Sequence, residues 1–179
     1  MKRVLIISAS PRANGNSDIL AQRFAQGAID AGNIVDIVNL REKRIAYCTG
    51  CNYCQKHQGD CCLKDDVDGI IDQMIASDVL VFATPTYFYS MAGQLKVLID
   101  RTTGKYAEIK NKEVYYLISA QDTNEKLLSK VVVALEGFTM DCLEGTLEKG
   151  VLFASGVAEK GEVNKTDYPQ KAYAMGQSV

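Results

Sequence analysis

The stretch VLIISASPRANGNS, residues 4–17, joins an apolar run to a polar loop that contains a glycine. The run Val4–Ile7 consists of leucine and β-branched residues, which is typical of a strand buried on both faces of a parallel sheet. Beyond the loop, apolar residues recur at helical spacing and predict a helix from Asp18 to Ala31. A buried strand that turns directly into a helix indicates an α/β fold.

The same alternation of strand and helix continues along the chain. Further strands are predicted at Ile34–Leu40, Asp78–Ala83, Glu113–Ser119 and Gly150–Val157, and helices at Asp65–Ala76, around Leu95, Leu98 and Ile99, and through Leu127, Leu128, Val131 and Leu135. This order predicts a three-layer, doubly wound α/β domain with a five-stranded parallel sheet. We expect one domain over residues 1–179, with an irregular insertion at about 41–64 and a polar, mobile end over the last ten or so residues.

The composition restricts the classes of function. A formal net charge of −2 gives no broad basic face for nucleic acid, and no apolar run approaches the roughly 20 residues that span a bilayer. The apolar run that follows Lys2 and Arg3 is too short for a signal peptide, so we expect a cytoplasmic protein that does not bind a membrane. Its six cysteines are then expected to stay reduced.

The loop SASPRANGNS, residues 8–17, has the features of an anion site because it precedes a helix, whose N-terminal amides and dipole attract anions. Gly15 allows close approach of the backbone, and Arg12 can add a charge-assisted contact. Ser10, Asn16 and Ser17 offer hydrogen bonds, and Ser17 can also cap the helix. No GxxxxGK[ST] or GxGxxG motif is present, so a monophosphate ester fits this loop. A capped polar turn without a ligand is the alternative.

Two further loops are expected at the same edge of the sheet, where ligands bind in open α/β folds. The segment TPTYFYSMAG, residues 84–93, supplies aromatic side chains, a stiff Pro85 and backbone amides, which suits a flat ring with polar edges. The segment SAQDTN, residues 119–124, ends the fourth predicted strand. A phosphate at one end and an aromatic ring at the other is the shape of flavin mononucleotide (FMN).

Together with the cysteine-rich segment, SASPRANGNS and TPTYFYSMAGQLKVLIDR (residues 84–101) resemble the NADPH-dependent FMN reductase family, including its iron–sulfur flavoprotein branch. The resemblance implies a flavodoxin-like sheet of order 2-1-3-4-5, NAD(P)H as co-substrate, and a homodimer or homotetramer. It also implies that Ser8, Ser10, Arg12, Gly15, Asn16 and Ser17 hold the FMN phosphate, that Pro85, Thr86, Tyr87 and Phe88 border the ribityl chain and ring, and that Ser119, Ala120 and Gln121 complete the ring pocket. We interpret Lys96 and Asp100 as a solvated i,i+4 pair.

Five of the cysteines form a cluster in the sequence. Cys48, Cys51 and Cys54 are each separated by two residues, and Cys61 and Cys62 follow after six more. Such thiolates can hold a [4Fe–4S] cluster, as the resemblance implies, with Cys61 or Cys62 as fourth ligand; tetrahedral zinc or bare thiols are the alternatives. The sixth, Cys142, is expected to be a small buried hydrophobe, and His57 a solvated loop residue.

The residues and the resemblance together favour an oxidoreductase that takes hydride from NAD(P)H and passes electrons to a quinone, a flavin or another acceptor. No catalytic side chain is expected, because the flavin carries the chemistry. One alternative is an iron–sulfur flavoprotein electron carrier served by a ferredoxin-like donor. A zinc-stabilised binding protein is a further alternative, but it leaves the three strand-end loops without a role.

Overall fold

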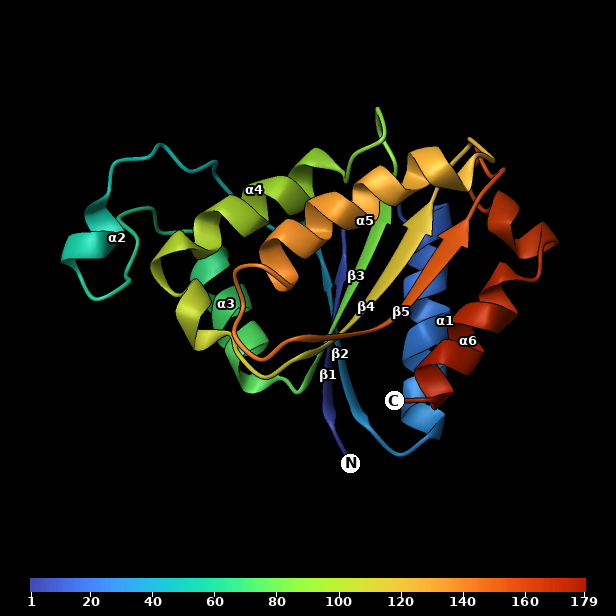
Figure 1. The fold of residues 1–179 in the computed structure, drawn as a ribbon, viewed down its shortest axis with the longest axis horizontal. Coiled ribbons are helices and arrows are strands. Elements are labelled where there is room, and N and C mark those ends of the chain that lie inside the picture. Colours follow the sequence, from blue (N-terminus) through green and yellow to red (C-terminus); the bar gives the residue numbers. More distant parts are fainter.

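In the computed structural model, which describes residues 1–179, five parallel strands form one sheet in the order β2-β1-β3-β4-β5 (Figure 1). The strands are β1 (Arg3–Ser8), β2 (Ile34–Asn39), β3 (Val79–Pro85), β4 (Glu113–Ser119) and β5 (Leu147–Ala154). The predicted fold class and strand order are confirmed. The strand order reverses between β1 and β3, and this is the point at which open α/β sheets bind ligands.

Helices cover both faces of the sheet (Figure 1). One face carries α1 (Asn16–Asp30) and α6 (Tyr168–Gln177), and the other carries α3 (Val67–Ala76), α4 (Gly93–Arg101) and α5 (Glu125–Thr139). Short elements complete the chain: α2 (Tyr53–Lys56) and the 3₁₀ turns η1 (Leu40–Glu42), η2 (Thr102–Gly104), η3 (Tyr106–Glu108) and η4 (Glu162–Lys165). None of the helices combines the length and the apolar character that crossing a membrane requires.

The apolar run of β1 supplies both layers of the core. Leu5 and Ile7 pack with the helices α3, α4 and α5, whereas Val4 and Ile6 pack with α1 and α6. This division follows from the two-residue period of a strand, which points successive side chains to opposite faces. The prediction of a strand buried on both faces is therefore confirmed, and β1 holds the loop that follows it in a fixed position.

The prediction of a mobile polar end is wrong, because residues 168–177 form α6 and pack along α1. Two glycines allow the helices to meet backbone to backbone: a Cβ on Gly27 would collide with the carbonyl oxygen of Tyr173, and one on Gly176 with that of Phe24. The hydroxyl of Tyr173 also donates to Asp30, at 2.7 Å. The end of the chain is thus ordered by tertiary contacts and not by its own hydrophobicity.

Candidate functional site

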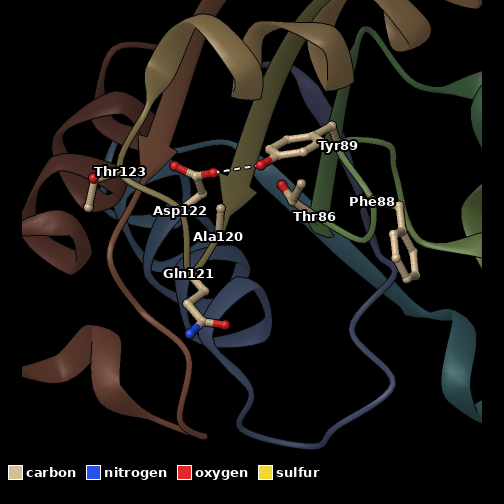
Figure 2. A pocket seen from close by; sticks show the side chains of 7 residues that line it. All are labelled: Thr86, Phe88, Tyr89, Ala120, Gln121, Asp122 and Thr123. Atoms are coloured by element: carbon tan, nitrogen blue, oxygen red, sulfur yellow. Dashed lines mark hydrogen bonds between the residues drawn. The ribbon is translucent and has the colours of Figure 1, made fainter.

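Four neighbouring strands end at one edge of the sheet, and the loops that follow them enclose two adjoining hollows. The first, here called the Arg12 hollow, has a volume of about 180 Å³ and is lined by Arg12, Asn16, Pro85, Thr86, Tyr87, Ser119, Ala120, Gln121, Val157 and Ala158. The second, the Tyr89 hollow, has a volume of about 570 Å³ and is lined by Thr86, Phe88, Tyr89, Ala120, Gln121, Asp122 and Thr123 (Figure 2). Thr86, Ala120 and Gln121 belong to both, so one elongated ligand can occupy the two.

Most of the residues expected around a flavin lie on these walls. The structure brings together Arg12, Asn16, Pro85, Thr86, Tyr87, Phe88, Ser119, Ala120 and Gln121. Ser8, Ser10, Gly15 and Ser17 are absent from the linings and lie behind them, all buried. No site residue was predicted in the loop after β5, although Val157 and Ala158 line the Arg12 hollow. Val157 ends the fifth predicted strand and Ala158 follows it, and this position at a strand end was the signal that could have identified them.

The loop between β1 and α1 is folded tightly on itself. The hydroxyl of Ser10 donates to the carbonyl oxygen of Arg12 at 2.8 Å, and the Gly15 amide donates to the same oxygen at 2.9 Å. A Cβ on Gly15 would lie 2.6 Å from the Ser10 hydroxyl oxygen, so only glycine fits here without displacing the loop. The guanidinium of Arg12 is exposed and donates to Ala158 at 3.3 Å. It therefore bridges two strand-end loops at the mouth of the hollow.

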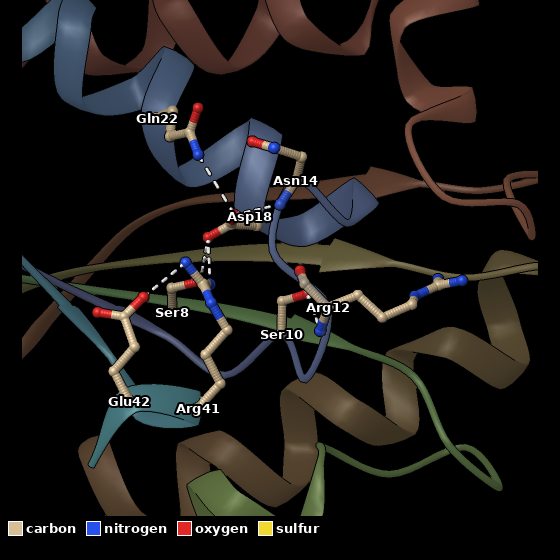
Figure 3. Close-up of polar contacts among 8 residues, drawn as sticks. All are labelled: Ser8, Ser10, Arg12, Asn14, Asp18, Gln22, Arg41 and Glu42. Atoms are coloured by element: carbon tan, nitrogen blue, oxygen red, sulfur yellow. Dashed lines mark hydrogen bonds and ion pairs between the residues drawn. The ribbon is translucent and has the colours of Figure 1, made fainter.

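The buried carboxylate of Asp18 fixes the position of this loop (Figure 3). Oδ1 of Asp18 accepts hydrogen bonds from the Ser8 hydroxyl and the Arg41 guanidinium, both at 3.0 Å, and Oδ2 accepts from the Asn14 amide at 2.8 Å and from Gln22 at 3.3 Å. The hydroxyl hydrogen of Ser8, a predicted phosphate contact, is therefore already donated to Asp18. Sequence reasoning missed Asp18 and Arg41, because nothing in their local pattern marks them as partners.

The prediction that Ser17 caps α1 is wrong, because Gly15 occupies the N-cap position and Ser17 lies within the first turn. The Ser17 hydroxyl oxygen is buried and has no hydrogen-bond partner in the protein, and the same is true of the Thr86 hydroxyl. Buried polar groups are normally paired, so two orphaned hydroxyls near the strand ends indicate a missing polar ligand. Together with the unpaired amides that begin α1, they fit a phosphate ester and its polyol chain.

The loop after β3 places aromatic rings beside the Tyr89 hollow. Tyr87 and Ser90 exchange backbone hydrogen bonds at 3.0 Å, and the two residues between them have positive φ angles, 49° at Phe88 and 56° at Tyr89. Positive φ is uncommon for bulky residues and recurs at functional sites. The Phe88 side chain is fully exposed and points away from the other labelled side chains in Figure 2.

Asp122 is the one carboxylate on the walls of the two hollows. Its oxygens accept from the Asn124 amide and from the Tyr89 hydroxyl, each at 2.8 Å. The hydrogen bond from the Asn124 amide, and to a smaller extent the one from the Tyr89 hydroxyl, hold the pKa of Asp122 below its usual range. The hydrogen bond between Tyr89 and Asp122 also raises the pKa of Tyr89. Asp122 lies in the quoted loop SAQDTN, which was the signal that could have identified it.

The five clustered cysteines lie away from these hollows, around a separate cavity of about 190 Å³. All are free thiols, and the sulfurs of Cys51 and Cys62 are 3.9 Å apart. The pKa of Cys51 is lowered, chiefly by a hydrogen bond from the Tyr53 amide and to a smaller extent by contacts with Thr49 and Cys62. The pKa of Cys62 is raised, chiefly by its contact with Cys51. No three ligand side chains already converge on one point. The donor set nevertheless consists of soft thiolates, which fits an iron–sulfur cluster or zinc.

An ion pair closes the two ends of the cysteine segment. The guanidinium of Arg101, at the end of α4, donates twice to Asp65, at 2.7 and 3.1 Å, and once to the Ala46 carbonyl at 2.7 Å; Asp65 also accepts from the Ala46 amide at 2.9 Å. Burial alone would raise the pKa of Asp65, but hydrogen bonds from Arg101, Ala46 and Val67 outweigh it and lower the pKa. We call this junction of Ala46, Asp65 and Arg101 the neck.

The tip of the segment is held as well. The backbones of Gly59 and Gly104 touch, since a Cβ on Gly104 would collide with the Gly59 carbonyl oxygen, and Lys105 pairs with Asp60 at 3.4 Å. In Figure 1 the segment around α2 projects from the end of the molecule opposite α1 and α6. The insertion is therefore a closed loop, attached at its neck and its tip.

Three minor predictions can be compared with the structure. Cys142 is exposed and donates to the Gly137 carbonyl at 3.1 Å, so the expectation of a buried residue is wrong. It lies in the turn after α5, where the adjacent Leu143 is buried but Cys142 faces solvent. Lys96 and Asp100 form the expected exposed i,i+4 ion pair. His57 is exposed, as expected, and stacks on the Tyr53 ring at 3.6 Å between centroids.

Comparison with known proteins identifies related sequences. A family model described as NADPH-dependent FMN reductase matches residues 2–144. An iron–sulfur flavoprotein of Methanocaldococcus jannaschii is 36% identical over 100 residues, which cover 56% of this chain and 51% of that protein. Thus the chain matches about half the length of this curated relative.

Solved structures share the fold at low sequence identity. An NAD(P)H:quinone oxidoreductase from Methanothermobacter marburgensis superposes with a TM-score of 0.79 at 18% identity, over 99% of this chain and 95% of that chain. An FMN-dependent NADH-azoreductase from Bacillus anthracis, solved in complex with FMN, gives a TM-score of 0.74 at 16% identity, over 99% of each chain. At these identities the comparison establishes a shared fold.

Proposed function

The chain belongs to the NADPH-dependent FMN reductase family, and on this premise we propose that it is an FMN-dependent oxidoreductase that passes electrons from NAD(P)H to a quinone, a flavin or another small-molecule acceptor. The observation that carries the proposal is the pair of adjoining hollows at the strand ends, with the orphaned hydroxyls of Ser17 and Thr86. Bound FMN would supply the redox chemistry, accepting hydride and releasing electrons.

The Arg12 hollow is the proposed phosphate end. The Ser17 hydroxyl and the first amides of α1 would donate to phosphate oxygens, and the helix dipole would favour the negative charge. Arg12 can reach over the mouth and add a charge-assisted bond. The Asn16 side-chain oxygen already accepts from the Val163 amide, so its nitrogen is the group left to donate.

The Tyr89 hollow is the proposed ring and substrate end. Thr86, Ala120 and Gln121 connect it to the Arg12 hollow, so they would border the polyol chain and the near edge of the ring. Tyr89 and Asp122 form one wall, and the remaining opening leaves room for a nicotinamide or an acceptor. No side chain here is needed as a general acid or base.

Anaerobic mixing tests the proposal. Purified protein loaded with FMN should lose its visible flavin absorbance within seconds of adding NADH or NADPH, and should regain it when a quinone is added. Free FMN at the same concentration is the control, since it is reduced slowly without a protein. Flavin that stays oxidised in the presence of both nicotinamides would rule out the reductase.

A second candidate is an electron carrier that takes electrons from a ferredoxin-like donor through a [4Fe–4S] cluster. The observation that favours it is that all five clustered cysteines surround one cavity. Iron and acid-labile sulfide, measured on anaerobically prepared protein, test it. Thiolates on one tetrahedral zinc at about 2.3 Å would lie roughly 3.8 Å apart, close to the 3.9 Å between Cys51 and Cys62. Zinc is therefore the metal to measure alongside iron.

We also propose that the protein is a homodimer or homotetramer. The fully exposed Phe88, beside the half-exposed Tyr87, leaves an apolar surface next to the proposed flavin site. A second copy is a natural cover for such a surface. Light scattering on the FMN-loaded protein tests this, and a Phe88→Ser variant should shift the mass toward the monomer if Phe88 lies in the interface.

A further inference from the structure

The guanidinium of Arg101 has one donor that nothing in the protein accepts. Its side chain is 1% exposed, and both terminal nitrogens are used at the neck, on Asp65 and on the Ala46 carbonyl. The Nε–H, in contrast, is buried without a partner. Buried charged donors are normally paired, because leaving one unpaired is costly, so such a group indicates that an acceptor is missing.

The missing acceptor belongs to the cysteine cavity. Arg101 lines that cavity together with all five clustered cysteines, and Cys61 lies beside the guanidinium. The two cavity carboxylates outside the neck do not pair with Nε: Asp100 pairs with Lys96, and Asp68 makes no hydrogen bond or ion pair with Arg101. Cys62, in contrast, lies beside Cys51, 3.9 Å from its sulfur. Among the cavity groups, the thiol of Cys61 therefore remains as the one beside this guanidinium.

We propose that Arg101 is a positioning residue for a thiolate-held iron–sulfur cluster, and that Cys61, not Cys62, is the fourth ligand. The Nε–H of Arg101 donates to the Cys61 sulfur or to a sulfide of the cluster, and the guanidinium charge offsets part of the negative charge that four thiolates bring to the cavity. Because the same guanidinium closes the neck, binding of the cluster and closure of the segment support each other. The inference rests on the second candidate above, in which the cysteines hold a cluster.

Opposite charge changes at the neck provide the test. The single variant Asp65→Asn removes a negative charge beside Arg101. The double variant Asp65→Asn/Arg101→Gln removes the positive charge as well, and its two amides can still hydrogen-bond to each other. Positive charge and N–H···S bonds raise a cluster's reduction potential. The single variant should therefore shift the midpoint potential upward relative to wild type, and the double variant should bring it below that of the single variant. Iron and sulfide per protein are measured on the same samples.

A purely structural neck predicts something different. Both variants would then loosen the segment and lose iron to the same extent, without opposite shifts in potential, and this result would overturn the inference. FMN content is the folding control, because the flavin site is built from other loops. Cys61→Ser should lose iron and Cys62→Ser should retain it; the reverse would overturn the ligand assignment.

The two proposals fail separately. Wild-type protein that binds FMN but takes up no iron and sulfide on anaerobic reconstitution would overturn the inference and leave the reductase standing. Protein that holds the cluster but neither binds FMN nor reacts with NAD(P)H would overturn the proposed reductase and leave the inference standing.

Discussion

The hydroxyl of Tyr89 donates a hydrogen bond to Oδ2 of Asp122 at 2.8 Å and thereby joins the loop after β3 to the loop after β4. Both residues lie on the wall of the Tyr89 hollow (Figure 2). The contact connects two loops that are attached to neighbouring strands of a rigid sheet. It therefore ties together two loops that border the hollow in which the flavin ring is proposed to lie.

Removing this contact should loosen the ring end. Tyr89→Phe deletes the donor and separates the two loops that border the hollow, so the dissociation constant for FMN should rise by about two- to tenfold. Quenching of flavin fluorescence measures it. Tyr106→Phe is the matched control, since Tyr106 is exposed on η3 and has no part in the hollow. An equal effect of the control would show that the contact is irrelevant.

The phosphate end should depend on Arg12 and Ser17. The double variant Arg12→Ala/Ser17→Ala removes one charged donor and one orphaned hydroxyl, and FMN affinity should fall by at least about tenfold while the circular dichroism spectrum stays the same. Arg3→Ala/Ser129→Ala removes the same residue types from exposed positions and should leave affinity unchanged. Full retention in the first double variant would place the anion elsewhere.

Asp18 offers a test in which charge and position predict opposite results. Asp18→Asn removes a negative charge near the proposed phosphate, so charge alone predicts tighter FMN binding. The carboxylate, however, accepts hydrogen bonds from Ser8, Asn14 and Arg41, and an amide cannot accept all of them. We expect weaker binding, measured by equilibrium dialysis. Asp36→Asn, an exposed change on β2, serves as the charge control.

Acid should destabilise the neck. The pKa of Asp65 is lowered from its ordinary value of 3.8, so the folded protein favours the ionised form. That stabilisation is present above the ordinary pKa and is lost as the pH falls through the lower folded value. The free energy of unfolding in urea should therefore decrease between about pH 5 and pH 2, and Asp65→Asn should show a smaller decrease over the same range. Equal slopes would show that other carboxylates account for the acid sensitivity.

The contact between α1 and α6 should tolerate no added atom. Gly27→Ala places a methyl group against the Tyr173 carbonyl, and such overpacking destabilises by about 1–3 kcal/mol, or roughly 2–4 °C in melting temperature per kcal/mol. Gly137→Ala is the control: Gly137 lies in α5 with open space around it, so the same substitution there should stabilise slightly. Calorimetry of both variants measures the change in melting temperature, which should be negative for Gly27→Ala and slightly positive for Gly137→Ala.

The scaffold was predictable because its signals are local. Four consecutive apolar residues, Val4–Ile7, predict a buried strand, and the loop that follows them carries its own glycine and hydroxyls. The helix α6 gave no such signal, since Ala172 and Gly176 are small and become buried only because α1 lies across them.

The neck and the Asp18 cluster were not predictable for a related reason. Arg101 and Asp65 are 36 positions apart, and in the sequence each reads as an ordinary surface charge. Asp18 reads as a favourable acid at a helix start, and its partner Arg41 follows a different strand. Pairings of this kind are decided by the folded arrangement of distant segments.

The neck also bears on how such a protein can diversify. Ala46 and Asp65 are in direct hydrogen-bond contact, so the two ends of the cysteine loop meet at the neck. A loop whose ends already touch can be lengthened or shortened at small entropic expense to the rest of the fold. A scaffold built this way can gain or lose such a loop through insertions and deletions between its two ends, without redesign of the sheet that carries it.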